Sequence, residues 1–296
     1  MRIHPDESVE RLALGTVQFG LAYGVSNAGG QVAADEVAAI LSAARAVGID
    51  TLDTAIAYGD SEAVLGQLGI RDWRVVSKLP ALPTPAEDVA CWVHAQFAAS
   101  LQRLGVGYVE GLLLHRPDQL KGPGGDALWA ALRGLREQGL VRRIGVSIYS
   151  HEELPELTAG RRFDLVQAPL NILDRSLVDS GWVQRLKEHG TELHVRSAFL
   201  QGLLLMGPDR PARFARWQPI WQQWDDWLEQ HGLSPLQASL RYCLSLPQVD
   251  RVVVGVESAA QLREIVDAAK GELPPPPDWS MPVDAMLVNP AKWNQL

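Results

Sequence analysis

The chain has 296 residues, of which 47% are hydrophobic and 21% are charged, as expected for a globular protein with a substantial core. Its 27 basic and 35 acidic residues give a net charge of −8, which argues against nucleic acid or an anionic membrane as the main partner. The first ten residues are too polar for a signal peptide, and no apolar run approaches membrane-spanning length. We therefore expect a cytoplasmic protein.

The two cysteines, Cys91 and Cys243, lie far apart in the chain and match neither a CxxC motif nor a metal-binding spacing. Two histidines, His189 and His194, likewise have no partner at the spacing of metal ligands. We therefore expect a reduced chain with two packed thiols and no metal site.

From residue 11 onward, short apolar runs alternate with longer segments of helical periodicity. The short runs predict strands over residues 11–17, 49–54, 73–78, 109–115, 141–147, 163–168, 191–197 and 250–256. The longer segments predict helices over residues 35–47, 62–68, 85–104, 126–138, 152–157, 177–189, 214–230, 235–246 and 258–270. Tryptophans recur at helical spacing in the stretch 214–230, which is more typical of packing than of a ligand site.

The order of these elements predicts an α/β protein with a (β/α)8 TIM barrel fold, a parallel eight-stranded barrel. We see no linker that would divide the chain, and we expect residues 1–296 to form a single domain. A proline-rich segment at residues 274–277 lies in a C-terminal tail, residues 272–296. The tail either covers the active-site rim or wraps loosely on the barrel.

Four polar residues of different chemistry fall where the predicted strands end. Asp53 ends the second strand, and Tyr58 follows in the next loop. Lys78 and His115 end the third and fourth strands. Taken singly, each has an ordinary structural explanation: a turn, a packed ring, an ion pair or a core histidine. Together, at the rim where TIM barrels carry their chemistry, they predict an assembled catalytic site.

These four groups suit the transfer of a proton. A phenol with a pKa near ~10 is a poor acid at neutral pH. A nearby ammonium favours the phenolate and lowers that pKa, while a carboxylate holds and neutralises the ammonium. An imidazole can then hydrogen-bond a substrate carbonyl and orient it. Tyr58 would thus protonate an oxygen while a hydride reaches the adjoining carbon.

Four motifs occur in a fixed order: DTAxxYGxSE (residues 53–62), SK (77–78), LLHRPD (113–118) and IGVS (144–147). With them, the chain from about Leu14 to Val266 resembles the aldo-keto reductase family. The resemblance implies a catalytic tetrad of Asp53, Tyr58, Lys78 and His115. It implies that Tyr58 is the general acid for reduction and the general base for oxidation. It also implies an NAD(P)H-dependent oxidoreductase of an aldehyde, ketone or sugar, or an alcohol or aldose dehydrogenase that uses the site in reverse.

The resemblance further implies that a nicotinamide dinucleotide, NAD or NADP, lies extended across the same rim without a Rossmann fold. Ser147 and Gln167 would hold its carboxamide, and Arg196 would support its ring in place of the usual aromatic side chain. The loop with Ser197, Leu200 and Gly202 would wrap the pyrophosphate, although an ordinary turn would also need a glycine. The remaining cofactor-binding candidates lie near the ends of the first and eighth strands: Gly15, Thr16, Gly255, Glu257, Gln261 and Glu264.

The chain departs from the family pattern at positions that bear on the cofactor. Ile148 stands where the family often has an asparagine that bonds the carboxamide. Gly255 and Gln261 stand where many NADPH-dependent members carry basic residues, and Glu257 adds negative charge nearby. A 2′-phosphate would find little compensation, whereas a carboxylate can accept a hydrogen bond from a free ribose hydroxyl. We therefore expect NAD(H) to be tolerated or preferred. Glu264 either contacts the adenine or is a solvated helix residue.

Two classes of function remain open at this stage. One is the oxidoreductase with a small-molecule carbonyl or sugar substrate. The other is a nicotinamide-cofactor-binding regulatory or accessory protein that uses the same barrel as a redox sensor, with little or no turnover. Tyr23 and Tyr149 are candidates for the substrate pocket or for packing. The sequence indicates no oligomeric state.

Overall fold

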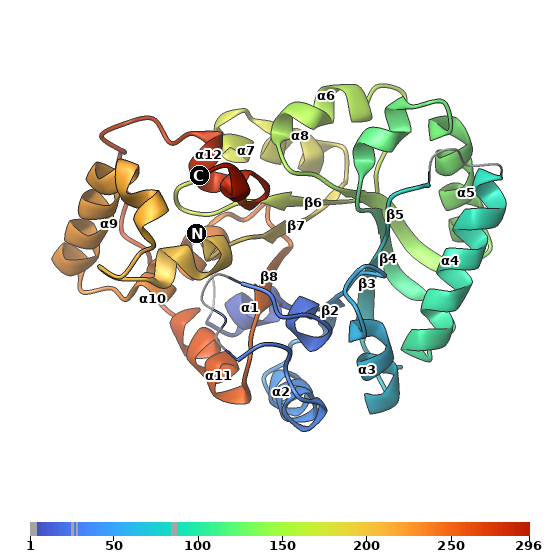
Figure 1. Cartoon of the computed structure of the whole chain (residues 1–296), viewed down its shortest axis with the longest axis horizontal. Helices are drawn as coiled ribbons and strands as arrows, with labels where there is room; N and C mark the ends of the chain where they lie inside the picture. The colour runs from blue at the N-terminus through green and yellow to red at the C-terminus, as the bar shows by residue number, and fades with distance from the viewer. Residues whose placement is uncertain (1–4, 25–26, 28, 84–87) are drawn as a thin grey trace.

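Eight short strands form the centre of the molecule. The computed structural model describes residues 5–24, 27, 29–83 and 88–296. Each strand pairs in parallel with the next along the chain, and the last closes on the first, which confirms the predicted barrel (Figure 1). The strands are β1 (Leu12–Gly15), β2 (Thr51–Asp53), β3 (Arg74–Leu79), β4 (Val109–Leu114), β5 (Val141–Ser147), β6 (Leu165–Pro169), β7 (Glu192–Arg196) and β8 (Arg251–Gly255).

Helices surround the barrel (Figure 1). The α-helices are α1 (Pro5–Glu10), α2 (Ala34–Ala46), α3 (Ser61–Leu68), α4 (Val89–Leu104), α5 (Gly125–Glu137), α6 (Leu154–Leu157), α7 (Ser176–Asp179), α8 (Trp182–Glu188), α9 (Gln218–His231), α10 (Pro235–Ser245), α11 (Ala259–Ala268) and α12 (Ala285–Val288). The 3-10 helices are η1 (Val17–Phe19), η2 (Pro117–Lys121), η3 (His151–Glu153), η4 (Leu200–Leu205), η5 (Ala212–Trp217) and η6 (Pro290–Gln295).

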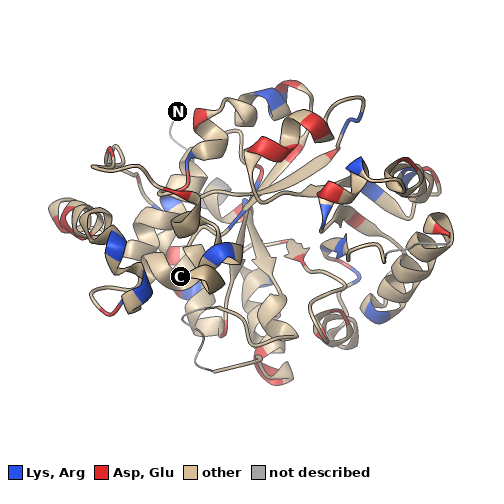
Figure 2. Cartoon of the chain, turned by 45° about the horizontal axis from the view of Figure 1, so that its top comes forward, with Lys and Arg blue, Asp and Glu red and all other residues tan. Residues whose placement is uncertain are grey.

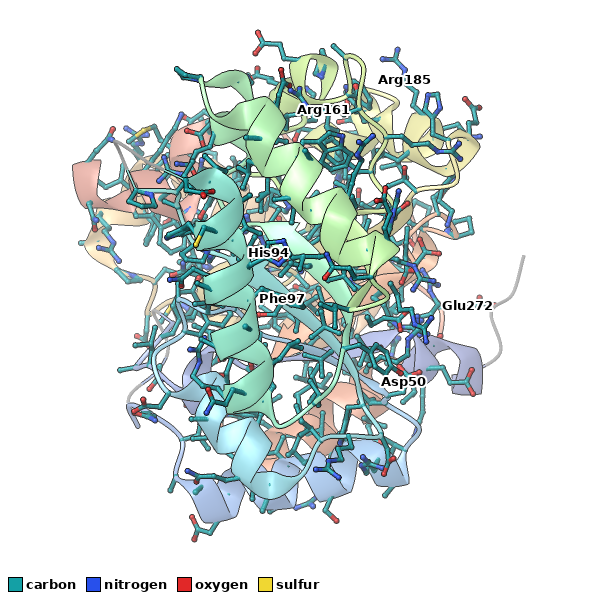
Figure 3. The ribbon with its side chains drawn as sticks, turned by 90° about the vertical axis from the view of Figure 1, so that its right-hand side faces the viewer. Asp50, His94, Phe97, Arg161, Arg185 and Glu272 are labelled. Carbon is teal, nitrogen blue, oxygen red and sulfur yellow. The ribbon has the colours of Figure 1, made fainter. Side chains whose placement is uncertain are left out.

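The outer surface carries charges of both signs. Lys and Arg are interspersed with Asp and Glu over the helices (Figure 2). The helices α4 and α5 pack side by side along one side of the barrel, where Phe97 of α4 is buried (Figure 3). In the part of the chain that the structure describes, no helix has both the length and the apolar character needed to cross a membrane.

Three predicted helices each form two elements in the structure, and one of them, 152–157, is divided into η3 and α6. The segment 177–189 forms two helices, α7 and α8, instead of one. Gly181 lies between them with a φ of 76°, a left-handed conformation that interrupts the helix and that glycine adopts readily. The stretch 214–230 begins as the 3-10 helix η5 and becomes α-helical only at Gln218, where α9 starts.

The helix α4 also differs from its prediction. Its expected range was 85–104, but residues 85–87 lie outside the described part of the chain, and the helix there begins at Val89. The prediction that both thiols are packed is wrong for Cys91, which is exposed near the start of α4. Helical periodicity does not fix how closely the first turn of a helix approaches the sheet, so the sequence did not indicate this exposure.

The core confirms two other expectations from the sequence. Trp217, Trp221 and Trp224 are among the largest fully buried side chains, as their helical spacing predicted. Cys243 is buried, and burial raises the pKa of its thiol to about 12, so the thiol stays protonated and unreactive.

The C-terminal tail makes both apolar and polar contacts with the barrel's outer helices. Trp293 in η6 is 4% exposed, and its ring meets the ring of Phe214 edge-on with 4.9 Å between centroids. The backbone oxygen of Pro277 accepts a hydrogen bond of 2.9 Å from Nη2 of Arg175.

Glu62, the last residue of the DTAIAYGDSE segment, joins three elements. Its side chain is buried, and Oε1 accepts hydrogen bonds from Ser77 at 2.8 Å and Ser100 at 2.7 Å. Its Oε2 accepts from Nε and Nη2 of Arg103 at 2.9 and 2.6 Å. A buried carboxylate is tolerated when donors surround it in this way. Glu62 therefore fixes α3 to β3 and α4. Because the Tyr58 loop leads directly into α3, Glu62 also helps to fix that loop.

Acidic and basic side chains form a network at the N-terminal end of the barrel: Asp50 (labelled in Figure 3), Arg74, Glu110, Arg143, Glu192, His194 and Arg251. Glu192 is central to it, with Oε2 at 2.7 Å from Nε of Arg143 and Oε1 at 2.9 Å from Nε2 of His194. Although burial raises the pKa of Glu192, the hydrogen bond and charge of His194 and the charge of Arg143 lower it to about 2.

This network makes the stability of the fold depend on pH. Because the pKa of Glu192 is lower in the folded chain than its ordinary value of 4.5, its contribution is complete above about pH 4.5 and is lost as the pH falls towards 2. We expect Glu192→Gln to lower the free energy of unfolding at pH 7 by roughly 1–3 kcal/mol. Urea denaturation at a series of pH values measures both effects, with the exposed Glu229→Gln on α9 as the control. A variant as stable as the wild type at pH 7 would contradict this account of Glu192.

Candidate active site

A cavity of about 690 Å³ opens at the C-terminal ends of the strands. Residues from the ends of several strands and from the loops that follow them line it, as in other barrels of this type. All the predicted catalytic and cofactor-binding residues line this cavity except Lys78 and Leu200, which are buried behind its surface. The structure thus brings residues that are scattered in the sequence to one rim.

The strand register explains this convergence. Gly15 of β1 is paired with Asp53 of β2 on one side and with Gly255 of β8 on the other. Ser147 of β5 is paired with Gln167 of β6. Because all strands are parallel, their final residues meet at the same edge of the barrel.

A buried ion pair lies at the base of the cavity. The Nζ atom of Lys78 is 2.7 Å from Oδ1 of Asp53 and also donates a 2.9 Å hydrogen bond to the backbone oxygen of Thr54. The Lys78 and Asp53 side chains are 1% and 6% exposed. Burial opposes the charge of Lys78, but the charge of Asp53, the charge of Tyr58 and the Asp53 hydrogen bond raise its pKa above the ordinary value. Lys78 is therefore an ammonium at neutral pH.

Tyr58 and His115 face this ion pair. The Nζ atom of Lys78 lies 5.2 Å from the centroid of the Tyr58 ring. The rings of Tyr58 and His115 meet edge-on, with 5.9 Å between centroids and an interplanar angle of 78°. Both rings are half-buried and line the cavity. The four residues predicted from the strand ends therefore form one cluster.

Glycine makes the position of Tyr58 possible. Gly20, in the loop after β1, lies against the Tyr58 loop so closely that a Cβ atom there would be 1.9 Å from the Tyr58 backbone oxygen. Gly59 follows Tyr58 with a φ of 53°, in the left-handed region that other residues rarely adopt. The backbone oxygen of Tyr58 accepts a 3.0 Å hydrogen bond from the Ser61 amide at the start of α3.

His115 is held in its neutral form. Burial, followed by the charges of Lys78 and Arg196, lowers its pKa to about 4. A neutral imidazole has one ring N–H and one unprotonated nitrogen, so it can donate a hydrogen bond without carrying charge.

A hydrogen-bonded chain links the ion pair to two of the predicted cofactor-binding residues. Nε2 of Gln167 donates a 2.6 Å hydrogen bond to Oδ2 of Asp53. Oε1 of Gln167 accepts a 3.3 Å hydrogen bond from Ser147. All three side chains are buried. Gln167 therefore supports Asp53 directly, a contact that the sequence did not indicate because the two residues are far apart along the chain.

The loop after β7 has an uncommon backbone. Ser197, Leu200 and Gln201 have positive φ values of 64°, 49° and 52°, and Gly202 follows at 91°. Such conformations cost energy in residues other than glycine and are concentrated at functional sites. Ser197, Gln201 and Gly202 line the cavity, whereas Leu200 points into the core. Nε2 of Gln201 also donates a 3.0 Å hydrogen bond to the Tyr23 hydroxyl, which lies in the loop after β1.

Arg196 lies at the end of β7. Its Nη2 donates a 3.0 Å hydrogen bond to the backbone oxygen of Ile148, and its Nη1 lies 3.3 Å from Oγ of Ser197. The guanidinium carbon lies 4.9 Å from the centroid of the Tyr149 ring. Tyr149 and Tyr23 both line the cavity, and both are about 40% exposed (41% and 42%).

Gln18, which belongs to none of the sequence motifs, lies at the β8 end of the cavity. A Cβ atom at Gly255 would be 2.6 Å from Nε2 of Gln18, so the missing side chain leaves room for this carboxamide. Oε1 of Gln18 is buried and has no hydrogen-bond partner among the described residues. Oε1 of Gln261, which also lines the cavity, accepts a 2.8 Å hydrogen bond from the Glu257 amide. The only sequence signal for Gln18 is its place just after β1.

Comparison with known proteins shows to which family the chain belongs. The chain matches the model of the aldo/keto reductase family over residues 11–276. It is 24% identical over 273 residues to the NADH-specific methylglyoxal reductase of Escherichia coli (strain K12), a match that covers 77% of this chain and 81% of that protein. It is 25% identical over 252 residues to a 6-dehydroglucose reductase from Novosphingobium aromaticivorans, with 79% and 81% covered.

Solved structures agree with the sequence matches. A putative aldo-keto reductase from Pseudomonas aeruginosa has a TM-score of 0.65 and 27% identity, covering 88% of this chain and 89% of that one. The glycerol dehydrogenase AKR11B4 from Gluconobacter oxydans shares the fold, with a TM-score of 0.70 and 22% identity over 89% of this chain and 88% of that one. Because the family model spans most of its length, the chain belongs to the aldo/keto reductase family of NAD(P)-dependent oxidoreductases.

Proposed function

We propose that Tyr58 donates the proton in the reduction of a small carbonyl compound and accepts it in the reverse reaction. The observation that carries this proposal is the cluster of a buried Lys78–Asp53 ion pair, Tyr58 and a neutral His115 at one end of the cavity. The ammonium stabilises the negative charge that develops on the Tyr58 oxygen as its proton leaves. Asp53 holds the ammonium in place for this purpose.

His115 orients the substrate in this proposal. As a neutral ring it donates a hydrogen bond to the carbonyl oxygen, which also polarises the carbonyl group. Its low pKa has a further consequence: the ring does not compete with Tyr58 as the proton donor near neutral pH. Tyr58 thus transfers the proton, and His115 positions the carbonyl oxygen that receives it.

The residues around the cavity fit a nicotinamide dinucleotide. Three polar features of the lining lie beside the catalytic cluster: the Gln18 carboxamide packed against Gly255, the loop of Ser197 and Gly202 with its positive φ values, and the Oε1 atom of Gln18, which has no hydrogen-bond partner among the described residues. When bound there, the nicotinamide would supply the hydride. Of the residues predicted from the sequence, Leu200 is buried in the core, and we propose that the others hold the dinucleotide: Gly15, Thr16, Ser147, Gln167, Arg196, Ser197, Gly202, Gly255, Glu257, Gln261 and Glu264.

We propose that the chain uses NAD(H) at least as well as NADP(H). Among the described residues, neither arginine nor lysine lines the β8 end of the cavity. Burial already raises the pKa of Glu257, and the double charge of a 2′-phosphate beside it would be poorly compensated. The Escherichia coli relative is by its name NADH-specific, which supports this proposal.

The alternative of a redox sensor with little turnover is not favoured. Relatives that match over most of the chain are named as reductases, and the four catalytic candidates are assembled in one cluster. By their names, these relatives act on methylglyoxal and on 6-dehydroglucose, which supports a small, oxygen-rich aldehyde or ketone as the substrate here.

Pro290 and Ala291 of the C-terminal tail line the cavity. On this basis we propose that the tail contributes to substrate choice by covering part of the active-site rim. The organisation of residues 1–296 as a single domain, and a cytoplasmic location, stay predictions from the sequence.

The first test is the removal of the proposed proton donor. We expect Tyr58→Phe to lower kcat for aldehyde reduction by about 100- to 10,000-fold, because general acid catalysis contributes about that much. The stability of the fold should change little, since the backbone N–H and oxygen of Tyr58 make the hydrogen bonds that hold its loop, to Ala55 and Ser61. Stopped-flow or steady-state oxidation of NADH measures the rate, and Tyr108→Phe, at an exposed tyrosine outside the cavity, is the control. Full activity in Tyr58→Phe would contradict the assignment.

The second test concerns the protonation of His115. We expect its ring to titrate at about pH 4, because burial, Lys78 and Arg196 all disfavour the charged form. Histidine NMR signals followed from pH 3.5 to 8 report this directly, with His115→Gln identifying the signal. We expect kcat/KM to show no ionisation of this residue near pH 6.5. A His115 ring that titrates near 6.5 would show that the imidazole is not held neutral as proposed.

The third test concerns the dinucleotide. We expect the Kd of NADH to be no larger than that of NADPH, and the double variant Glu257→Gln, Gln261→Arg to tighten NADPH by roughly 10-fold by compensating phosphate charge. Protein-fluorescence titration with each nucleotide measures both values, and the Kd of NADH should change much less. A wild-type protein that binds NADPH far more tightly than NADH would refute the preference.

A further inference from the structure

Arg196 makes no ion pair with an acidic side chain of the described residues. It is the only arginine or lysine among the described residues that line the cavity. The other nearby cation, Lys78, is neutralised by Asp53 at 2.7 Å. The hydrogen bonds of Arg196 go instead to two neutral groups, the backbone oxygen of Ile148 and the hydroxyl of Ser197. Within the described part of the chain, it takes part in no salt bridge.

The contacts of Arg196 fix its position but leave part of its hydrogen-bonding capacity free. A guanidinium has five N–H donors, and these contacts use one on Nη1 and one on Nη2. Nε has no hydrogen-bond partner among the described residues. One face of the Arg196 guanidinium lies over the Tyr149 ring, and this contact restricts the rotation of the guanidinium. The remaining N–H groups are therefore pre-positioned donors.

The charge of Arg196 acts on the catalytic end of the cavity. It lowers the pKa of His115, after the larger effects of burial and Lys78. It also opposes the rise in the pKa of Tyr23 that burial causes. By contrast, Glu257 and Glu264 lie in the lining after β8, at the proposed adenosine end. In a chain of net charge −8, a half-buried cation that makes no ion pair and lies beside the reaction centre attracts an anion.

We propose that Arg196 binds a carboxylate of the substrate, so that the physiological substrate is a carbonyl compound that is also a carboxylic acid. The inference rests on the proposed reductase function and names its substrate class. The planar fork of a guanidinium matches a carboxylate in two parallel hydrogen bonds. One guanidinium also balances the single charge of a carboxylate, whereas a phosphate monoester carries up to two charges. The reaction is unchanged: the carbonyl gains a hydride and the Tyr58 proton and becomes an alcohol, while the carboxylate keeps its charge.

The proposal differs from a role of Arg196 in holding the dinucleotide. Support for the nicotinamide ring would use the face of the guanidinium that Tyr149 leaves free, whereas a substrate carboxylate would use its edge. A contact with the dinucleotide affects every substrate equally. A contact with the substrate affects only those that carry the charge. A comparison of charged and uncharged substrates of the same skeleton therefore separates the two roles.

The experiment compares such pairs at saturating NADH. The pairs are pyruvate with methylglyoxal, 4-oxobutanoate with butanal, and glucuronate with glucose; glyceraldehyde 3-phosphate with glyceraldehyde tests phosphate. We expect the wild type to favour the carboxylated member, and Arg196→Gln to lower kcat/KM for it by about 10- to 100-fold more than for its partner, since hydrogen bonds to charged groups are worth that much. Arg196→Lys should retain part of the preference. Arg185→Gln, on the exposed surface of α8, is the control (Figure 3).

Equal losses for charged and uncharged partners, or a preference confined to the phosphate pair, would overturn the carboxylate assignment while leaving the reductase function intact. Calorimetric titration with oxamate, which cannot be reduced, and with its uncharged methyl ester gives a second readout. We expect oxamate to bind more tightly than the ester and to lose this advantage in Arg196→Gln. If the wild type reduced none of the carbonyl compounds, the proposed function would fail, and this titration would still decide for or against the carboxylate site.

Discussion

The buried ion pair between Lys78 and Asp53 is the interaction on which the proposed active site depends. Burying an ammonium and a carboxylate is costly, and the cost is offset only when both are fully hydrogen-bonded. Here Lys78 donates to Asp53 and to the Thr54 backbone, and Asp53 accepts from Lys78 and from Gln167. Replacement of such a pair by apolar residues is often neutral or stabilising, so its presence points to function. What it supplies is a fixed positive charge behind the Tyr58 ring.

The barrel brings the other residues of the proposed site next to this ion pair. Parallel pairing places the ends of β2, β3 and β4 next to one another, and with them Asp53, Lys78 and His115. The Tyr58 loop is then fixed from two sides, by the close approach of Gly20 and by α3, which Glu62 anchors to its neighbours. The charge network around Glu192 lies at the opposite, N-terminal end of the barrel, away from the proposed catalytic residues. The charged groups that stabilise the fold and those proposed for catalysis thus lie at different ends of the same strands.

The sequence was sufficient to predict the barrel and the grouping of the four candidate residues at its rim, because both follow from where apolar runs stop and polar residues begin. It was not sufficient where the outcome depends on contacts between distant segments. The roles of Gln18 and Glu62, and the bond from Gln167 to Asp53, are set by the distance between strands, which no local pattern encodes. Leu200 illustrates the same limit: its loop lies at the cavity, yet its side chain points into the core because the backbone there is left-handed.

The central claim is that Lys78 acts through Tyr58, and a double-mutant cycle on kcat/KM tests it most directly. The cycle compares the wild type, Tyr58→Phe, Lys78→Met and the double variant, each first shown by circular dichroism to be folded. If the two residues act as one unit, the double variant should be about as slow as the slower single variant, because removing one partner already removes the effect of the other. If the two losses instead multiply, Lys78 and Tyr58 act independently, and the account of the ion pair as the support of the proton donor is wrong.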